Sequence, residues 1–163
     1  MENINKIIKT KITKLNNSNK QFKDIFEIVH DLEDNIFSEI SDGYKIKSLT
    51  YKEIKDQSIL MGKYLYNELQ YIEKNTFVGL MMDNSVEFIN VFFGLLMIGY
   101  KPMLLNIRLG NELNNQIIDR LNIKYVVTDN DYSVNGKIVN IKNSNYRTLN
   151  IDSLITSWEN EMA

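Results

Sequence analysis

One continuous segment, residues 77–113, restricts the fold more than any other part of the sequence. Residues 77–82 are an apolar run of strand length, and residues 102–105 form a second apolar run after a proline. A helix-like stretch of apolar residues lies between the two runs. Two strands joined by a helix in this way predict a right-handed βαβ unit with parallel pairing.

The helix between these strands carries its own start and stop signals. Asp83-Asn84-Ser85 supplies side-chain oxygens for the free N–H groups of the first turn, and Asn84 with Glu87 matches a capping box. Apolar residues then continue almost without a break through Ile98, which predicts a helix buried on most of its circumference. Gly99 predicts the end of the helix, because glycine adopts the left-handed conformation without steric cost.

Similar signals outline the elements on both sides. Residues 36–40 and 44–49 flank a Ser-Asp-Gly turn and predict a β-hairpin near residues 36–49. Thr50 and Glu53 form a capping box at the start of a helix. The apolar face of this helix continues through Met61, Leu65, Leu69 and Ile72.

The later part of the chain predicts one more helix and two strands. An apolar stripe is followed by Asn122, which suits a left-handed helix stop, and residues 125–127 read as a buried strand. Asn135-Gly136 predicts a tight turn before a strand at residues 138–141, closing a small hairpin. The stripe consists of Leu113, Ile117 and Leu121.

The two ends of the chain are predicted to be helical. Residues 1–19 form an amphipathic basic helix and a linker, and residues 20–163 form a single α/β subdomain. Within this subdomain, residues 22–32 predict a second amphipathic helix and residues 151–158 a last one. We therefore expect an α/β fold with a parallel-rich sheet and flanking helices.

Composition limits the classes of function. The formal net charge of −2 gives no basic field for nucleic acid, and we expect no nucleic-acid partner. Without cysteine and with His30 as its one histidine, the sequence excludes thiol catalysis and the usual zinc sites. His30 is interpreted as a surface or boundary residue. With no secretory signal and no span of ~20 apolar residues, we expect a cytoplasmic protein.

Five short blocks between residues 47 and 129 resemble, in order and spacing, the N-terminal region of adenylate-forming ligases. That superfamily includes acyl-CoA synthetases, luciferases and the adenylation domains of peptide synthetases. The sequence departs from the pattern of this superfamily at two places, Tyr100-Lys101 after the glycine and Gly110 at a helix start. The resemblance therefore does not identify the subfamily. The blocks are Leu49-Thr50-Tyr51-Lys52-Glu53-Ile54, Phe77-Val78-Gly79-Leu80, Asn84-Ser85-Val86-Glu87-Phe88, Phe93-Gly94-Leu95-Leu96-Met97-Ile98-Gly99 with Pro102, and Asn106-Ile107-Arg108-Leu109 with Glu112-Leu113, and Val126-Val127-Thr128-Asp129 is similar to the strand that follows them in the family.

The resemblance implies the N-terminal fragment of an ATP-dependent, AMP-forming acyl-CoA synthetase, inactive alone. It implies ATP, Mg²⁺ and CoA for the full-length ligase and none in this chain. The partners would be the rest of the large domain and a C-terminal domain, with self-association through an exposed apolar face. The alternatives are an adenylation-domain fragment of a peptide synthetase and a stand-alone α/β binding or scaffolding module. A membrane-surface role for the basic N-terminal helix is the weakest alternative.

We predict no catalytic, cofactor-binding or metal-binding residue in this chain. Residues 94–101 approach P-loop spacing but lack its Lys-Ser/Thr pair. Residues 129–140 approach a calcium loop but carry valine and asparagine where glycine and glutamate are needed. Asn106 and Arg108 remain of interest, because their block resembles the one in fatty acyl-CoA synthetases. Their simpler interpretation is a loop and a helix entry with a surface salt bridge.

Overall fold

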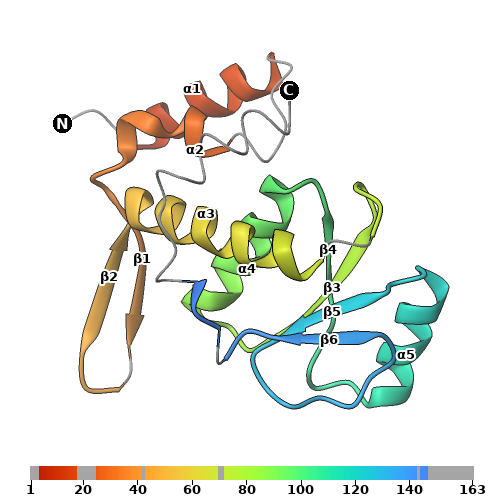
Figure 1. The fold of residues 1–163 in the computed structure, drawn as a ribbon. Helices are drawn as coiled ribbons and strands as arrows, with labels where there is room; N and C mark the ends of the chain where they lie inside the picture. Colours follow the sequence, from red (N-terminus) through yellow and green to blue (C-terminus); the bar gives the residue numbers. More distant parts are fainter. Residues whose placement is uncertain (1–3, 18–24, 42, 70–71, 143, 147–163) are drawn as a thin grey trace. The chain divides into compact units, whose positions relative to one another are not determined.

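The computed structural model describes residues 4–17, 25–41, 43–69, 72–142 and 144–146 (Figure 1). The chain divides into two compact units, Met1–Lys55 and Asp56–Ala163, which are treated separately below. The sequence-based division after residue 19 stays a prediction. The elements are α1 (Ile4–Asn16), α2 (Ile25–Ile28), a short 3-10 helix η2 (His30–Leu32), β1 (Ile36–Ser41), β2 (Ile46–Thr50), α3 (Tyr51–Glu68), β3 (Phe77–Met81), α4 (Val86–Met97), β4 (Lys101–Leu104), α5 (Asn111–Arg120), β5 (Tyr125–Thr128) and β6 (Lys137–Asn140).

The first unit contains the predicted β-hairpin. Strands β1 and β2 pair antiparallel, with Ile40 opposite Lys47 and Ser41 opposite Ile46. Gly43 in the connecting turn has a φ of +91°, a conformation that glycine adopts without strain. The capping box at the start of α3 is also confirmed. The Thr50 N–H donates to Glu53 Oε2 at 2.8 Å, and the Glu53 N–H donates to Thr50 Oγ1 at 3.2 Å.

The single helix predicted for residues 22–32 is wrong in its described part. Helix α2 ends at Ile28, and η2 follows as a separate 3-10 turn. Between them Val29 has φ −100° and ψ 18°, which leaves helical geometry and ends the hydrogen-bond ladder. Ion pairs then fix this region. Lys11 pairs with Asp31, and Lys55 Nζ lies 3.1 Å from Glu33 Oε1. Hydrogen bonds from Lys11 to Asp31, and from His30 and Lys55 to Glu33, lower the pKa of both carboxyl groups.

The second unit is built on a four-stranded parallel sheet with the strand order β4-β3-β5-β6. The register sets Val78 opposite Pro102 and Leu80 opposite Val127. This confirms the predicted βαβ unit of β3, α4 and β4. The small hairpin predicted before residue 138 is wrong, because β6 pairs parallel with β5. Residues 129–136 instead cross back over the sheet.

Contacts with α5 hold this crossover in place. The Asn135 N–H donates to Asn115 Oδ1 at 2.7 Å, and Asn135 Nδ2 donates to Asp119 Oδ1 at 3.1 Å. Gly136, with a φ of +91°, then turns the chain into β6. The turn was correctly located, but the direction of the next strand depends on this contact with α5.

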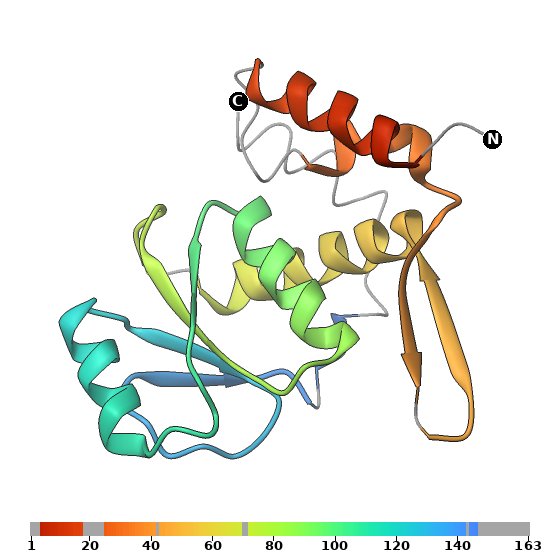
Figure 2. The ribbon, with the colours of Figure 1, turned by 180° about the vertical axis from the view of Figure 1, so that it is seen from behind.

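Alternate residues of the strands face two separate apolar layers. Val78 and Leu80 pack with α3 and α4, whereas Met81 and Val126 pack with Ile118 of α5. Helices therefore cover both faces of the sheet, as both ribbon views show (Figures 1 and 2). Tyr100 lies in the first layer, where its hydroxyl donates to the carbonyl of Ile72 at 3.2 Å. Burial, and then the nearby Tyr125, raise the pKa of Tyr100.

The ends of α4 agree with the predicted stop and correct the predicted start. The cap residue is Ser85 rather than Asn84, since Ser85 Oγ accepts from the Phe88 N–H at 3.1 Å. At the other end, the Tyr100 N–H donates to the Leu95 carbonyl at 3.0 Å, and Gly99 has a φ of +91°. These features are those of a Schellman motif. The P-loop-like residues 94–101 thus lie at a helix end.

Helix α5 ends as predicted, and Ile117 and Leu121 of the predicted stripe pack against the second apolar layer. Asn122 has a φ of +51°, and the Ile123 N–H donates to the Ile118 carbonyl at 2.9 Å. Leu113 was expected to face the core but is 49% exposed, whereas Ile118 is buried. The predicted helix at residues 151–158 lies outside the described residues. In the part of the chain that the structure describes, no helix has the length and apolar character needed to cross a bilayer.

Candidate functional site: a pocket where strands β3 and β4 end

The topology of the second unit creates a crevice beside strands β3 and β4. These two strands are neighbours and parallel, so both end at the same edge of the sheet. The loop after β3 leads to α4 on one face, and the loop after β4 leads to α5 on the other face. Ligands of open α/β sheets bind outside the carboxyl ends of the strands.

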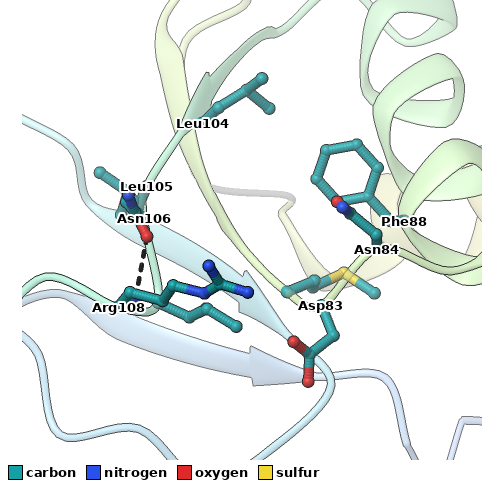
Figure 3. Close-up of a pocket in the computed structure, with 9 residues that line it drawn as sticks. Asp83, Asn84, Phe88, Leu104, Leu105, Asn106 and Arg108 are labelled. Atoms are coloured by element: carbon teal, nitrogen blue, oxygen red, sulfur yellow. Dashed lines mark hydrogen bonds between the residues drawn. The ribbon is translucent and has the colours of Figure 1, made fainter.

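A pocket of about 380 Å³ occupies this position (Figure 3). Its β3 side is formed by the end of the strand and the loop into α4, and its β4 side by the strand end and the loop into α5. Figure 3 shows the Arg108 guanidinium reaching from the β4 side toward the loop that carries Asp83 and Asn84. The lining residues are Met82, Asp83, Asn84, Phe88, Leu104, Leu105, Asn106, Ile107 and Arg108.

Hydrogen bonds fix the loop that carries Arg108. Asn106 Oδ1 accepts from the Arg108 N–H at 2.9 Å, which makes a side-chain-closed turn. The fully buried Asn114 of α5 donates from Nδ2 to the carbonyls of Asn106 at 3.0 Å and Leu109 at 3.5 Å. The backbone under Arg108 is therefore held in place before any ligand arrives.

The pocket carries one side chain of each charge. Within the described residues, neither the Arg108 guanidinium nor the Asp83 carboxylate has an ion-pair partner. The Asp83 carboxylate also affects the nearby Tyr132. The pKa of Tyr132 is raised by burial first, and then by the negative charges of Asp129 and Asp83. With amides on both sides and an apolar wall, the pocket is suited to holding a small molecule by one charged group.

The structure brings together residues that the sequence treated apart. Asn106 and Arg108 lie in the pocket, and the surface salt bridge suggested for them is wrong for Arg108 among the described residues. Asp83 was considered only as a capping residue. Its place opposite Arg108 follows from the parallel pairing of β3 with β4, which the sequence did predict. The sequence therefore contained enough information to place Asp83 near Arg108, because residues that follow two neighbouring parallel strands lie at the same end of the sheet.

Other sequence candidates lie elsewhere. His30 is exposed in the first unit, and its Nδ1 lies 2.9 Å from Glu33 Oε1. Residues 129–140, which approach a calcium loop, form the crossover after β5 and then strand β6. Among the residues that the structure describes, no group of three or more His, Cys, Asp or Glu side chains is placed to hold a metal ion.

Comparison with known proteins supports the same fold. No curated protein matches the chain. Among solved structures, the N-terminal subdomain of NpsA from Klebsiella oxytoca matches over 83% of this chain at 21% identity, with a TM-score of 0.64. The chain spans about a third of the length of that protein, 33%. The same subdomain has also been solved in complex with 3-hydroxybenzoyl-AMSN, with 19% identity over 83% of this chain and 32% of that one and a TM-score of 0.64.

A second protein with this fold is the nonribosomal peptide synthetase FmoA3 in an AMPPNP-bound form. It matches 77% of this chain and 14% of its own length, at 15% identity and a TM-score of 0.62. At such identities these neighbours establish the fold alone. The family model of AMP-binding enzymes matches residues 30–161. The chain therefore belongs to the AMP-binding enzyme family and corresponds to the N-terminal region of its adenylate-forming domain.

Proposed function

We propose that the chain is the N-terminal part of an adenylation domain that activates a carboxylic acid with ATP. The observation that carries this proposal is the family match over residues 30–161. In the full-length enzyme, a carboxylate oxygen of the acid attacks the α-phosphorus of ATP and pyrophosphate leaves, which gives an acyl-adenylate. A thiol then attacks the acyl carbon, and AMP leaves as the new thioester forms.

The pocket lining offers Arg108 and Asp83 as its charged groups, and no group of three or more His, Cys, Asp or Glu side chains within the described residues is placed to hold a metal ion. The family implies residues that hold ATP and stabilise the transferring phosphoryl group, and we propose that the rest of the full-length enzyme supplies them. The described sheet supplies a rigid layer against which such residues can be positioned.

Two thiols are candidates for accepting the acyl group from the acyl-adenylate, and the structural neighbours favour one of them. NpsA and FmoA3 are adenylation-type proteins of peptide synthetases, and one NpsA structure is an artificial fusion of adenylation and PCP domains, with a TM-score of 0.65 to this chain. We therefore propose a carrier-bound thiol as the acceptor. CoA is the second candidate, because the Asn106–Leu109 block resembles that of fatty acyl-CoA synthetases.

The proposal is tested with the full-length product of the gene that encodes this chain. Exchange of labelled pyrophosphate into ATP is measured with a panel of acids, beginning with 3-hydroxybenzoate and anthranilate, the acyl groups in the NpsA complexes. We expect exchange that depends on at least one acid and none from the 163-residue chain alone. No exchange with any aromatic, aliphatic or amino acid would contradict the proposal.

A second assay separates the two acceptors. The enzyme is loaded with the preferred acid and offered either CoA or a phosphopantetheine-bearing carrier protein. Thioester formed on the carrier and not on CoA supports the peptide-synthetase type. The reverse result would make the enzyme an acyl-CoA synthetase. The intact mass of the native gene product is measured as well. A mass near 19.1 kDa would favour a stand-alone binding or scaffolding module over both types of ligase.

A further inference from the structure

A second pocket, of about 320 Å³, lies in the second unit at the carboxyl ends of β3, β5 and β6. We propose that it binds the ammonium group of a small aliphatic amine, held by Asp129 and Ser144. Among the described residues it shares no lining side chain with the pocket at the ends of β3 and β4. The inference goes beyond the proposed function and does not rest on it.

The first support is a pair of buried oxygen atoms. Asp129 Oδ1 and Ser144 Oγ are shielded from solvent, and neither has a hydrogen-bond partner within the part of the chain that the structure describes. Both belong to side chains that line this pocket. Buried polar atoms nearly always have a partner in folded proteins, and a carboxylate oxygen without one costs free energy. A ligand that donates hydrogen bonds to these atoms would offset that cost.

The second support is the place of the pocket in the sheet. Strands β3 and β5 are parallel neighbours, but β3 leads through α4 to β4 on one side, whereas β5 leads to β6 on the other. The loops that leave the two strands therefore diverge and form a topological switch point. Ligands of open α/β sheets bind outside the carboxyl ends of the strands at such a point. Ser85 follows β3 and Asp129 follows β5, and both line the pocket.

Backbone contacts hold the two oxygen atoms at this edge of the sheet. The Ile141 N–H donates to the Thr128 carbonyl at 2.9 Å, which joins the ends of β5 and β6. The Ser144 N–H donates to the Ile141 carbonyl at 3.0 Å, and both ribbon views show residues 144–146 beside the start of α4 (Figures 1 and 2). The terminal torsion of an aspartate is broad, so Asp129 can turn an oxygen toward a donor in the pocket at little cost.

The third support is the sign of the charge. Two carboxylates, of Glu87 and Asp129, and one ammonium group, of Lys142, line the pocket, which leaves one net negative charge. A carboxylate accepts stronger hydrogen bonds from a charged donor than from a neutral one. A ligand with a carboxylate of its own would be repelled by Glu87 and Asp129, whereas Lys142 is exposed and its attraction is screened. The charges therefore favour an amine without a carboxylate.

The size of the pocket and the geometry of an ammonium group fit this class of ligand. The volume of about 320 Å³ lies within the range of small-molecule sites and exceeds what a bare ion fills. An ammonium group has three N–H donors, so it can serve Asp129 and Ser144 at the same time. A short carbon chain behind it would occupy the remaining space.

The test is a titration of the ¹⁵N-labelled chain with butylammonium chloride at about pH 7, where aliphatic amines are protonated, at constant ionic strength. Amide chemical shifts should change chiefly at residues 85–87, 128–130, 141 and 142. Asp129→Asn should weaken binding about tenfold or more, because it removes the charge from the contact. Ser144→Ala should weaken it about two- to tenfold.

Asp131→Asn is the matched control. It removes the same charge two residues further along the chain, from a side chain that is exposed and does not line the pocket. Its affinity for butylammonium should stay within about twofold of that of the unmodified chain, because exposed charges are screened. If Asp129→Asn had as little effect as Asp131→Asn, the proposed contact would be wrong.

Three further probes identify the ligand chemistry. 1-Butanol has the same chain without a charge, and norvaline adds a carboxylate next to the amine, so both should bind more weakly than butylammonium. Equal binding of 1-butanol would overturn the ammonium assignment. Tighter binding of norvaline would replace it with an amino-acid site. The same shifts with potassium chloride, at the same concentration, would assign the pocket to an inorganic cation and overturn the proposal.

The stability of the chain without ligand gives a second readout. Asp129→Asn removes a partly buried charge that has no partner, so the free energy of unfolding should stay equal or rise. A clear loss of stability would show that the carboxylate already has a partner, which contradicts the proposal. Failure of butylammonium to bind would leave the proposed activation of a carboxylic acid untouched, because pyrophosphate exchange by the full-length enzyme tests that separately.

Discussion

Single residues decide how α3 and α4 meet in the second unit. Asn90 of α4 is fully buried, and its Nδ2 donates to Gln57 Oε1 at 2.9 Å. One turn further along α4, Gly94 lies directly against the backbone of Gly62. The first contact satisfies a buried amide, and the second lets the two helix backbones approach without side chains between them.

Gly94→Ala is expected to destabilise the protein. A Cβ at this position would lie 2.9 Å from Gly62 N and 3.2 Å from the Ser58 carbonyl oxygen, so backbone would have to move. Such overpacking costs about 1–3 kcal/mol, whereas alanine gains ~1 kcal/mol over glycine inside a helix. We expect a net loss of up to about 2 kcal/mol in the free energy of unfolding, measured by urea denaturation.

Gly110→Ala is the control, because a Cβ there meets nothing within 4 Å and the φ of −60° suits alanine. It should change the free energy of unfolding by less than about 1 kcal/mol. If Gly94→Ala were as stable as Gly110→Ala, the close approach of the two helices would be wrong. The sequence could not reveal this contact, because the residues around Gly94 show only that it lies in an apolar helix.

Helix ends were the elements best predicted from sequence, because their signals are local. Gly99 and Asn122 end their helices in the left-handed conformation, and Thr50 with Glu53 forms the expected capping box. Errors arose where one local signal competed with another or with a distant contact. Adjacent polar residues at the start of α4 left the cap ambiguous. The direction of β6 depends on the contact of Asn135 with α5, which no local pattern encodes.

The α4 cap gives a direct test at this scale. Ser85→Ala removes the hydroxyl that accepts from the Phe88 N–H and should lower the free energy of unfolding by about 1 kcal/mol. Asn84→Ala, one residue earlier and exposed, should change it by less than about 0.5 kcal/mol. Both are measured by urea denaturation. A larger loss in Asn84→Ala than in Ser85→Ala would restore the capping box inferred from sequence.

At the scale of the whole molecule, the sequence predicted a parallel-rich sheet but not the order of its strands. The pocket depends on that order and on which face each helix covers. The segment 77–113 predicted that β3 and β4 are parallel neighbours. It did not predict that α4 and α5 lie on opposite faces, because both helices carry apolar stripes that could pack on either face.

The two units also differ in how much apolar surface they bury, which predicts different local stabilities. The central strands β3 and β5 are hydrogen-bonded on both sides, and Val78, Leu80 and Val126 are fully buried. In the hairpin, by contrast, Ile36 is 55% and Ile46 is 70% exposed. Amides open with free energies that follow such burial, from near zero up to the global value.

We therefore expect hydrogen exchange to separate the two sets of strands. Amides of β3 and β5 should exchange only through global unfolding, whereas those that pair β1 with β2 should exchange at least about a hundredfold faster, a difference of ~2.7 kcal/mol. The measurement is exchange in D₂O followed by NMR, with low urea added to identify amides that need global unfolding. Central-strand amides should respond steeply to urea, because their opening exposes the whole core, and hairpin amides should respond weakly. Equal rates and equal urea dependence in both sets would mean that the chain unfolds as one cooperative structure.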